Sequence, residues 1–308
     1  MPRVLRLPTS LKYVLAFTGV ATLSGLTLVY LLQCKLIYPA NFPSGSRKKV
    51  DYPSLYDMDN YEEVILATPD GEELQAYLIT QETEDITRKA PTLLYLHANA
   101  GNMGHRLPIA KRFYQRFQCN ILMLSYRGYG FSTGSPSESG LRIDAQTALD
   151  YILEHPLLRD TKIVVYGQSI GGAVAVDLVA RNEAKVKTLA VNALMIENTF
   201  LSIPKLIPHL FPFLGLFTFL CHQKWQTEEI ISEIRRTPVL FLSGVRDELV
   251  PPQHMKILHA KTLTTGGKYF NEFNAHHNDT CLSAGYFEVI DDFWARCIEK
   301  KVRRPFSS

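Results

Sequence analysis

The sequence predicts an α/β fold in which a mostly parallel central sheet is covered by helices on both faces. From residue 61 to residue 302, short aliphatic runs alternate with longer amphipathic stretches, a pattern typical of successive β-α-β units. The aliphatic runs are nearly continuous, which indicates strands buried on both faces. With 308 residues, of which 46% are apolar and 20% charged, the chain is long enough to bury such a core.

The charge balance and the cysteine pattern argue against several classes of ligand. Lysine and arginine number 33 and aspartate and glutamate 30, so the net charge is only +3. We therefore expect no nucleic-acid partner, which would require a dense basic face. The five cysteines form no C-x-x-C pair and the nine histidines form no H-E-x-x-H motif, so we expect no metal and no cofactor. Reduced thiols are the preferred interpretation of the cysteines, with one disulfide left open.

The first element is an uncharged apolar run of twenty residues, from Tyr13 to Leu32. As a helix it would span roughly 30 Å, the thickness of the bilayer hydrocarbon. A cleaved signal peptide would have a shorter apolar run followed by a small-residue cleavage site, whereas this run ends in Gln33-Cys34-Lys35. We therefore predict a tail over residues 1–12 and a retained signal anchor over residues 13–33. Basic residues flank the run on both sides, so its orientation in the membrane stays open.

Residues 34–60 contain several prolines and serines and show no sustained period. We predict a linker that lifts the following domain, residues 61–302, off the bilayer. The domain begins with two runs, residues 63–68 and 74–80, which are separated by Pro69-Asp70-Gly71 and predict a β-hairpin.

The remaining elements of the domain follow the alternation described above. Six further runs predict strands: residues 92–97, 120–126, 162–167, a run near 186–197, 238–244 and 268–273. Five stretches predict helices: residues 104–117, a helix capped by Ser137 that runs to His155, residues 170–181, 253–260 and 284–301. Residues 303–308 are assigned to a carboxy-terminal tail.

One segment, residues 198–236, breaks the alternation. Its sequence LIPHLFPFLGLFTFL is rich in leucine and phenylalanine, but Pro208 and Pro212 interrupt it. The stretch after Pro212 is too short for a second membrane span. We predict a short apolar cap insertion over the edge of the sheet, and an ordinary insertion packed into the core is an equal alternative.

A candidate nucleophile lies in Gly167-Gln168-Ser169-Ile170-Gly171, which matches G-x-S-x-G. The motif follows the predicted strand KIVVYG and opens the predicted helix IGGAVAVDLVA, which is the strand-turn-helix context of a nucleophile elbow. Such a turn imposes an unusual backbone conformation on the serine and exposes its hydroxyl. It also directs the Ile170 N–H at a developing oxyanion.

A serine hydroxyl is a weak nucleophile unless a base takes its proton. In this architecture the acid and then the histidine follow the serine, each just after a strand. Asp247 follows the strand PVLFLSG, with Glu248 as the neighbouring alternative, and His276 and His277 follow KYFNEF. One of these two histidines is expected to be the base.

A second oxyanion donor is expected from the loop after TLLYLH. The backbone N–H of Asn99 or of Ala98 can be directed at the same oxygen as that of Ile170. We expect His97 to make a structural hydrogen bond within this loop.

These residues together resemble the alpha/beta-hydrolase superfamily. Within it, five segments are similar to the membrane-anchored bud-emergence proteins and their animal relatives: HANAGNMGHRLP, SYRGYGFSTGSPSESG, YGQSIGGAVA, ENTFLSIP and HNDT. The resemblance covers about residues 60–300 and implies Ser169 as nucleophile, Asp247 as acid and His277 as base. It also implies a signal anchor and a location in the endoplasmic reticulum or another endomembrane. Two positions depart from the family: Ala98 stands for the usual glycine of the oxyanion loop and Ser125 for the usual aspartate before Tyr-Arg-Gly-Tyr-Gly.

The function predicted from the sequence is therefore a membrane-anchored serine hydrolase that cleaves an ester or thioester through an acyl-enzyme. The apolar segment 205–220 and the anchor favour a lipid or an acylated protein as substrate. A membrane scaffold with a hydrolase fold and no catalysis is the alternative.

Overall fold

The computed structural model describes residues 8–185 and 190–299. Its centre is a sheet in the strand order β1-β2-β4-β3-β5-β6-β7-β8. The bounds of these strands are β1 Tyr61–Ala67, β2 Glu73–Ile79, β3 Thr92–Leu96, β4 Asn120–Leu124, β5 Ile163–Gln168, β6 Ala193–Glu197, β7 Val239–Gly244 and β8 Lys268–Phe273. β2 is antiparallel to both β1 and β4, and the other neighbours are parallel. The predicted hairpin and mostly parallel sheet are thus confirmed.

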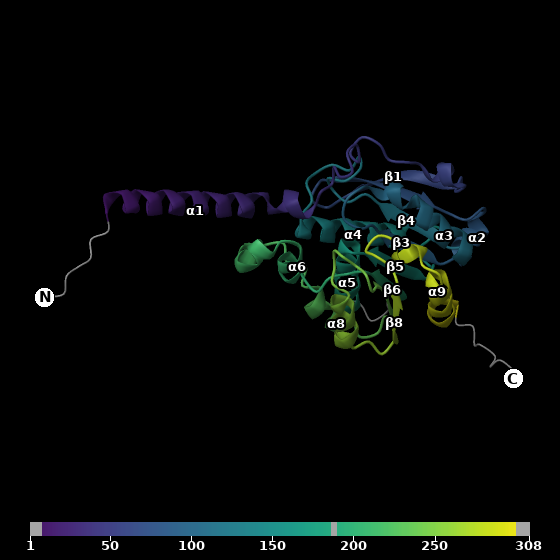
Figure 1. Ribbon diagram of the computed structural model, residues 1–308. Helices are drawn as coiled ribbons and strands as arrows, with labels where there is room; N and C mark the ends of the chain where they lie inside the picture. Colours follow the sequence, from purple (N-terminus) through teal and green to yellow (C-terminus); the bar gives the residue numbers. More distant parts are fainter. Residues whose placement is uncertain (1–7, 186–189, 300–308) are drawn as a thin grey trace.

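Helices surround this sheet (Figure 1). The α-helices are α1 Thr9–Ile37, α2 Glu84–Lys89, α3 Leu107–Phe117, α4 Glu138–Glu154, α5 Ile170–Lys185, α6 Ile203–Leu210, α7 Thr227–Ile230, α8 Gln253–Lys261 and α9 Tyr286–Trp294. The 3-10 helices are η1 Pro53–Tyr56, η2 Met103–Arg106, η3 Pro212–Leu220, η4 Ile231–Glu233 and η5 Thr280–Leu282, and a π-helical turn, η6, covers Ala295–Glu299. The cap predicted for α4 is present, because the Ser137 hydroxyl accepts a hydrogen bond from the Gly140 N–H.

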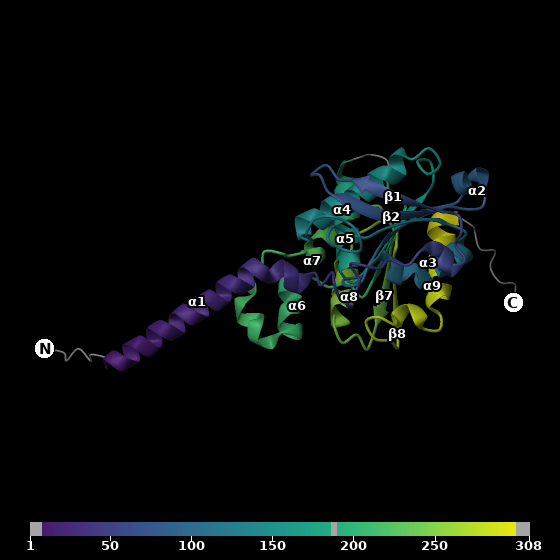
Figure 2. The ribbon, with the colours of Figure 1, turned by 90° about the horizontal axis from the view of Figure 1, so that it is seen from above.

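Two apolar cores lie on the two faces of the sheet. Successive strand residues alternate between them: Leu94 and Val165 pack with α4 and α5, whereas Leu93 and Val164 pack with α3 and α9. Figure 2 shows these helices on opposite sides of the strands. Burial on both faces is the physical reason for the continuous aliphatic runs in the sequence.

The amino-terminal helix α1 projects from this domain in both views (Figures 1 and 2). Within the described residues it is the one helix long and apolar enough to cross a membrane. It continues past the predicted anchor to Ile37 without a break. Tyr38, Val50 and Met58 of the following segment are buried in the domain, so residues 38–60 pack on the domain surface as well as connecting it to the helix.

Several sequence predictions fall partly outside the described residues, and the tail predicted over residues 1–12 is described only from residue 8. The run predicted near 186–197 forms β6 only from Ala193, and residues 186–189 are not described. The predicted last helix, 284–301, is described as α9 and η6 up to residue 299. The tail at 303–308 also lies outside.

The insertion 198–236 folds into α6, η3, α7 and η4. In both views α6 and η3 lie beside the domain end of α1 (Figures 1 and 2). We call α6 and η3 the cap. The carboxyl ends of the parallel strands meet at one edge of the sheet, and the loops after β3, β5, β7 and β8 carry the predicted site residues to that edge.

Candidate active site

Ser169 lies in a tight turn between β5 and α5. Its φ angle of 56° is in the left-handed region, which a residue with a side chain rarely adopts. The flanking glycines explain how the turn closes, since a Cβ at Gly167 would overlap the backbone of Gly171 and a Cβ at Gly171 would overlap the Leu96 carbonyl. The Ser169 N–H donates to the Glu197 carbonyl over 2.8 Å. The strained conformation expected from the motif is therefore present.

Asp247 and His277 contact each other in the interior of the domain. The His277 Nδ1 lies 2.7 Å from Asp247 Oδ2, and both side chains are buried. The other carboxylate oxygen, Oδ1, accepts hydrogen bonds from the N–H groups of Leu249 and Val250. A carboxylate only accepts, so Nδ1 carries the proton and Nε2 is left with a free lone pair. This arrangement gives the ring the tautomer that a general base requires.

His276 and Glu248, the alternatives to His277 and Asp247, form a second pair at the surface. The His276 ring lies 3.1 Å from a Glu248 carboxylate oxygen, and about half of each side chain is exposed. The same oxygen of Glu248 accepts from the His277 N–H. The structure thus brings His277 and Asp247 together in the interior and pairs His276 with Glu248 at the surface.

Ser169 and His277 line the same pocket. Within the described residues the Ser169 hydroxyl makes no hydrogen bond to the His277 ring. In unliganded enzymes this contact is often long and tightens only when substrate binds.

A buried polar network, to which the sequence pattern assigns no role, lies behind the turn at Ser169. Glu197 accepts hydrogen bonds from the Tyr166 and Tyr286 hydroxyls and from the Gln168 side-chain amide. Burial raises the pKa of Glu197 to about 7. The Gln168 amide also donates to the His277 carbonyl, so the network connects the turn at Ser169 to the loop that carries His277.

Asn198, directly after β6, is the second support of that loop. Its side-chain amide donates to the His277 carbonyl over 3.0 Å and to the Thr280 hydroxyl, while its oxygen accepts from the Gly244 N–H. A signal for both residues was present in the segment ENTFLSIP, which begins with Glu197 and Asn198, but a strand end alone does not indicate which side chains point inward.

The candidate oxyanion donors border the same pocket as Ser169. Ile170 is the first residue of α5, and Ala98 and Asn99 lie in the loop after β3. The Asn99 side chain is held by the Tyr129 hydroxyl and by its own bond to the Ile37 carbonyl. His97 contacts its own loop as expected, because its Nδ1 lies 2.7 Å from the Ala98 carbonyl oxygen. Burial lowers the pKa of His97 to about 3, so its ring is neutral.

The pocket at Ser169 has a volume of about 740 Å³ and a mostly apolar wall, which is within the range of small-molecule sites. The wall is drawn from α6, η3, the loop after β3, the start of α5 and the last turns of α1. Among the described residues no cluster of three or more His, Cys, Asp or Glu is arranged to hold a metal ion.

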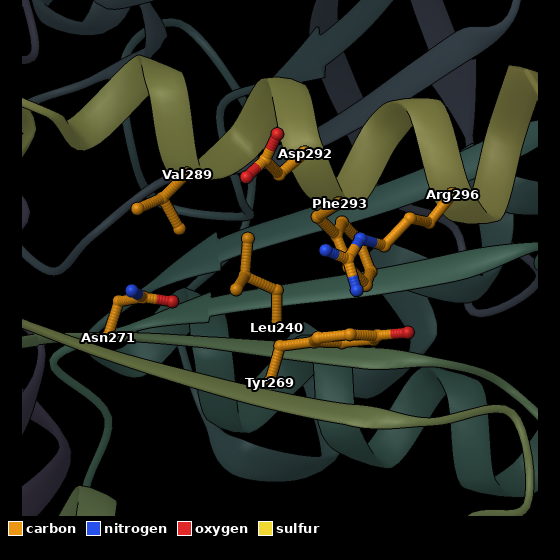
Figure 3. A pocket seen from close by; sticks show the side chains of 7 residues that line it. All are labelled: Leu240, Tyr269, Asn271, Val289, Asp292, Phe293 and Arg296. Atoms are coloured by element: carbon orange, nitrogen blue, oxygen red, sulfur yellow. The ribbon is translucent and has the colours of Figure 1, made fainter. Parts of the chain in front are cut away.

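Figure 3 shows a second, smaller hollow of about 160 Å³ between β7, β8 and α9. Its side chains come from the strands, as with Leu240 and Tyr269, and from the helical segment, as with Asp292 and Arg296. The described residues that line it include no serine, cysteine or histidine. It therefore offers no combination of side chains like Ser169 and His277 in the larger pocket.

Comparison with known proteins identifies close relatives. A family model for the alpha/beta hydrolase fold matches residues 91–214. The chain is 47% identical over 306 residues to Bem46 of Schizosaccharomyces pombe, which covers 98% of this chain and 99% of Bem46. It is 39% identical over 281 residues to the alpha/beta hydrolase domain-containing protein WAV2 of Arabidopsis thaliana, with 87% and 88% of the two chains covered. A membrane protein of Saccharomyces cerevisiae is 39% identical over 276 residues, with 89% of this chain and 93% of that protein covered.

Solved structures share the fold at low sequence identity. The esterase Pf2001 of Pyrococcus furiosus superposes with a TM-score of 0.66 at 16% identity, covering 82% of this chain and 96% of the esterase. An acetyl xylan esterase from Paenibacillus superposes with a TM-score of 0.61 at 16% identity, covering 82% and 87%. These likenesses and the relatives above confirm the fold and the resemblance predicted from the sequence.

Proposed function

The chain belongs to the alpha/beta-hydrolase family, in a group with Bem46 and WAV2, and on this premise we propose that it is a membrane-anchored serine hydrolase. The bond broken is a carboxylic ester or thioester. One observation carries the proposal: the His277 ring, hydrogen-bonded to Asp247, shares an apolar pocket with Ser169. The esterases among the solved structures of this fold support the same class of reaction.

In the proposed mechanism His277 Nε2 takes the proton of Ser169 Oγ as this oxygen attacks the carbonyl carbon of the substrate. The negative charge on the former carbonyl oxygen is met by the Ile170 N–H and by an N–H of Ala98 or Asn99. The leaving alcohol or thiol takes the proton back from His277 as the acyl-enzyme forms. Water, activated by the same ring, then hydrolyses the acyl-enzyme and releases the acid.

The apolar pocket favours an acyl group as the part of the substrate that is bound. A lipid and an acylated protein both present such a group. The length and composition of α1 support membrane attachment through residues 13–33, and the relative from Saccharomyces cerevisiae is named as a membrane protein. The endoplasmic reticulum or another endomembrane is part of the proposal, through the resemblance described above.

The test uses the purified full-length protein in a nonionic detergent. We expect it to hydrolyse a nitrophenyl butyrate ester and to be labelled by a fluorophosphonate probe, and we expect Ser169→Ala to lose both properties. The melting temperature of the variant controls for folding, with Ser139→Ala on the solvent-facing start of α4 as the matched substitution. Retained turnover in Ser169→Ala contradicts the mechanism, and an unlabelled wild-type protein favours the non-catalytic scaffold.

A further inference from the structure

The last turns of α1 form part of the wall of the pocket at Ser169. Val29, Gln33, Leu36 and Ile37 all line it. Their spacing places them on one face of the helix. The helix that is long and apolar enough to span a bilayer therefore continues directly into the substrate pocket.

A set of hydrogen bonds fixes α1 against the end of the cap. Gln33 is buried, its amide donates to the Leu220 carbonyl over 3.2 Å, and its oxygen accepts from the His222 N–H over 2.8 Å. Just beyond the helix, the Tyr38 hydroxyl donates to Gln223 and accepts from the Trp225 indole. A buried amide with both ends satisfied has a single orientation, so this contact holds the helix and the cap in register.

The cap residues of η3 divide into two apolar faces. In a 3-10 helix, side chains three positions apart lie above one another. Leu214, Phe217 and Leu220 line the pocket. Phe213, Leu216 and Phe219 form the outer face, and they are 92%, 83% and 76% exposed. Contiguous exposed apolar side chains of this size mark a surface that contacts a partner or a membrane.

The position of this outer face identifies the partner. Tyr30, which lies within the predicted span, packs against His222 at the end of the cap with ring centroids 5.1 Å apart. The outer face of η3 therefore lies beside a helix that we place in the bilayer, and lipid is the medium that surrounds both. The groove between α1 and the cap is lined by Val29, within the predicted span, and reaches Ser169 at its inner end.

Resting on the serine hydrolase proposed above, we infer that the groove between α1 and the cap admits the acyl chain of a lipid ester sideways from the bilayer. The occupant is a single long acyl chain, which lies between Leu36 on α1 and Phe217 on η3, with its ester carbonyl at Ser169. The anchor thus serves as one wall of the binding site in addition to attaching the protein. The substrate class is the membrane-resident lipid ester with a long chain.

The first experiment compares two tryptophan variants of α1 in the full-length protein, reconstituted in phosphatidylcholine vesicles. Leu36→Trp narrows the groove, while Leu31→Trp is the matched control, since Leu31 has almost the same exposure and lies on the opposite face of the helix. The readout is the ratio of kcat/KM for methylumbelliferyl oleate to kcat/KM for methylumbelliferyl butyrate. We expect Leu36→Trp to lower this ratio about tenfold and Leu31→Trp to leave it unchanged. Equal ratios in the two variants overturn the inference.

A third substrate tests whether the bound acyl chain comes from a membrane lipid or from an acylated protein. It is a water-soluble peptide carrying an S-palmitoyl group. The inference requires Leu36→Trp to impair hydrolysis of the oleate ester delivered in the bilayer. If the variant impairs only the peptide thioester delivered from water, the groove serves acylated proteins and the assignment to lipid is wrong.

A binding measurement separates this inference from the proposed catalysis. Full-length Ser169→Ala is reconstituted with an oleoyl lipid that carries a photoreactive diazirine in its chain, and the adducts are mapped by mass spectrometry. Adducts on Leu36, Leu214 or Phe217 support the groove even if the wild-type protein hydrolyses no ester. Adducts confined to the opposite face of α1, around Leu31, overturn the inference even if the protein is an esterase.

Discussion

On one side of Ser169 a buried polar network positions the loop that carries His277, whereas the other side is an apolar groove between α1 and the cap. The network consists of buried side chains joined by hydrogen bonds, from Glu197 through Gln168 to the loop of His277. The groove consists of aliphatic and aromatic side chains from α1 and the cap, several of them strongly exposed. Both regions adjoin Ser169, yet they are built from different kinds of contact.

The difference separates what each region contributes. Hydrogen bonds are directional, so the network positions the backbone of the His277 loop while the Asp247 carboxylate orients the His277 ring. Apolar contacts are not directional, and their strength scales with the area removed from water. In the function proposed above, the polar region would therefore determine whether a bond is cleaved, and the apolar region which acyl group reaches Ser169.

The largest effect is expected from removing a directional contact. Asp247→Asn keeps the shape of the side chain but presents an amide to His277, so the ring loses the acceptor that fixes its tautomer. We expect kcat for the butyrate ester to fall by about 10⁴-fold. Glu248→Gln keeps an oxygen that can accept from the His276 ring and the His277 N–H and leaves the contact between Asp247 and the His277 ring in place, so it is the matched control and should change kcat by less than about threefold. Equal losses would contradict the assignment of the acid to Asp247, and a large loss in Glu248→Gln alone would assign it to Glu248.

An intermediate effect is expected from the ionisation of the Glu197 carboxyl group, which should make the unfolding free energy depend on pH. The pKa of Glu197 is raised from 4.5 to about 7 in the folded chain, so the folded state binds this proton more tightly than the unfolded state. The unfolding free energy contributed by Glu197 is then fully present below pH 4.5 and is lost as the pH rises to about 7, by about 3 kcal/mol. Denaturant unfolding of the full chain in nonionic detergent at pH 5 and pH 8 measures this slope.

The control for this pH dependence is a pair of substitutions. Glu197→Gln cannot titrate and should lose the downward slope between pH 5 and pH 8, whereas Glu82→Gln, at an exposed position, should keep it. A Glu197→Gln variant with the slope of the wild type would mean that the carboxyl group is not responsible.

The smallest effect is expected at the outer face of the cap. Phe213 is almost fully exposed, so Phe213→Ser should change the unfolding free energy in detergent by less than about 0.5 kcal/mol. In phosphatidylcholine vesicles we expect oleate hydrolysis to fall about threefold, because less apolar area of the cap contacts lipid. Leu263→Ser, at an exposed position between α8 and β8, is the control and should leave oleate hydrolysis unchanged. An equal loss in both variants would show that the outer face of η3 has no specific contact with lipid.

The sequence predicted the polar side of the molecule better than the apolar side. Strand periodicity and the turn at Ser169 are local properties, and parallel strands bring the residues that follow them to one edge, so Asp247 and His277 could be named as candidates before their positions were known. Glu197 was not assigned a role, because its partners Tyr166 and Tyr286 are far apart in the chain.

The part of the pocket wall that α1 contributes could not be predicted from the periodicity of the sequence. Gln33 marks only the end of an apolar run in the sequence, and its partner Leu220 lies 187 residues further along. Residues 38–60 show no period, so nothing in their pattern distinguishes a free spacer from a segment that buries Tyr38 and Met58. Contacts of this kind depend on how distant segments pack.

The helix α1 runs unbroken from Thr9 to Ile37, and Gln33 fixes its end to the cap. If α1 anchors the protein as proposed above, a continuous helix fixed to the cap in this way holds Ser169 at a constant distance from the bilayer. The proposed hydrolase would then select esters by the depth of their carbonyl in the lipid leaflet. Two lipids with the same bond at different depths would be unequal substrates.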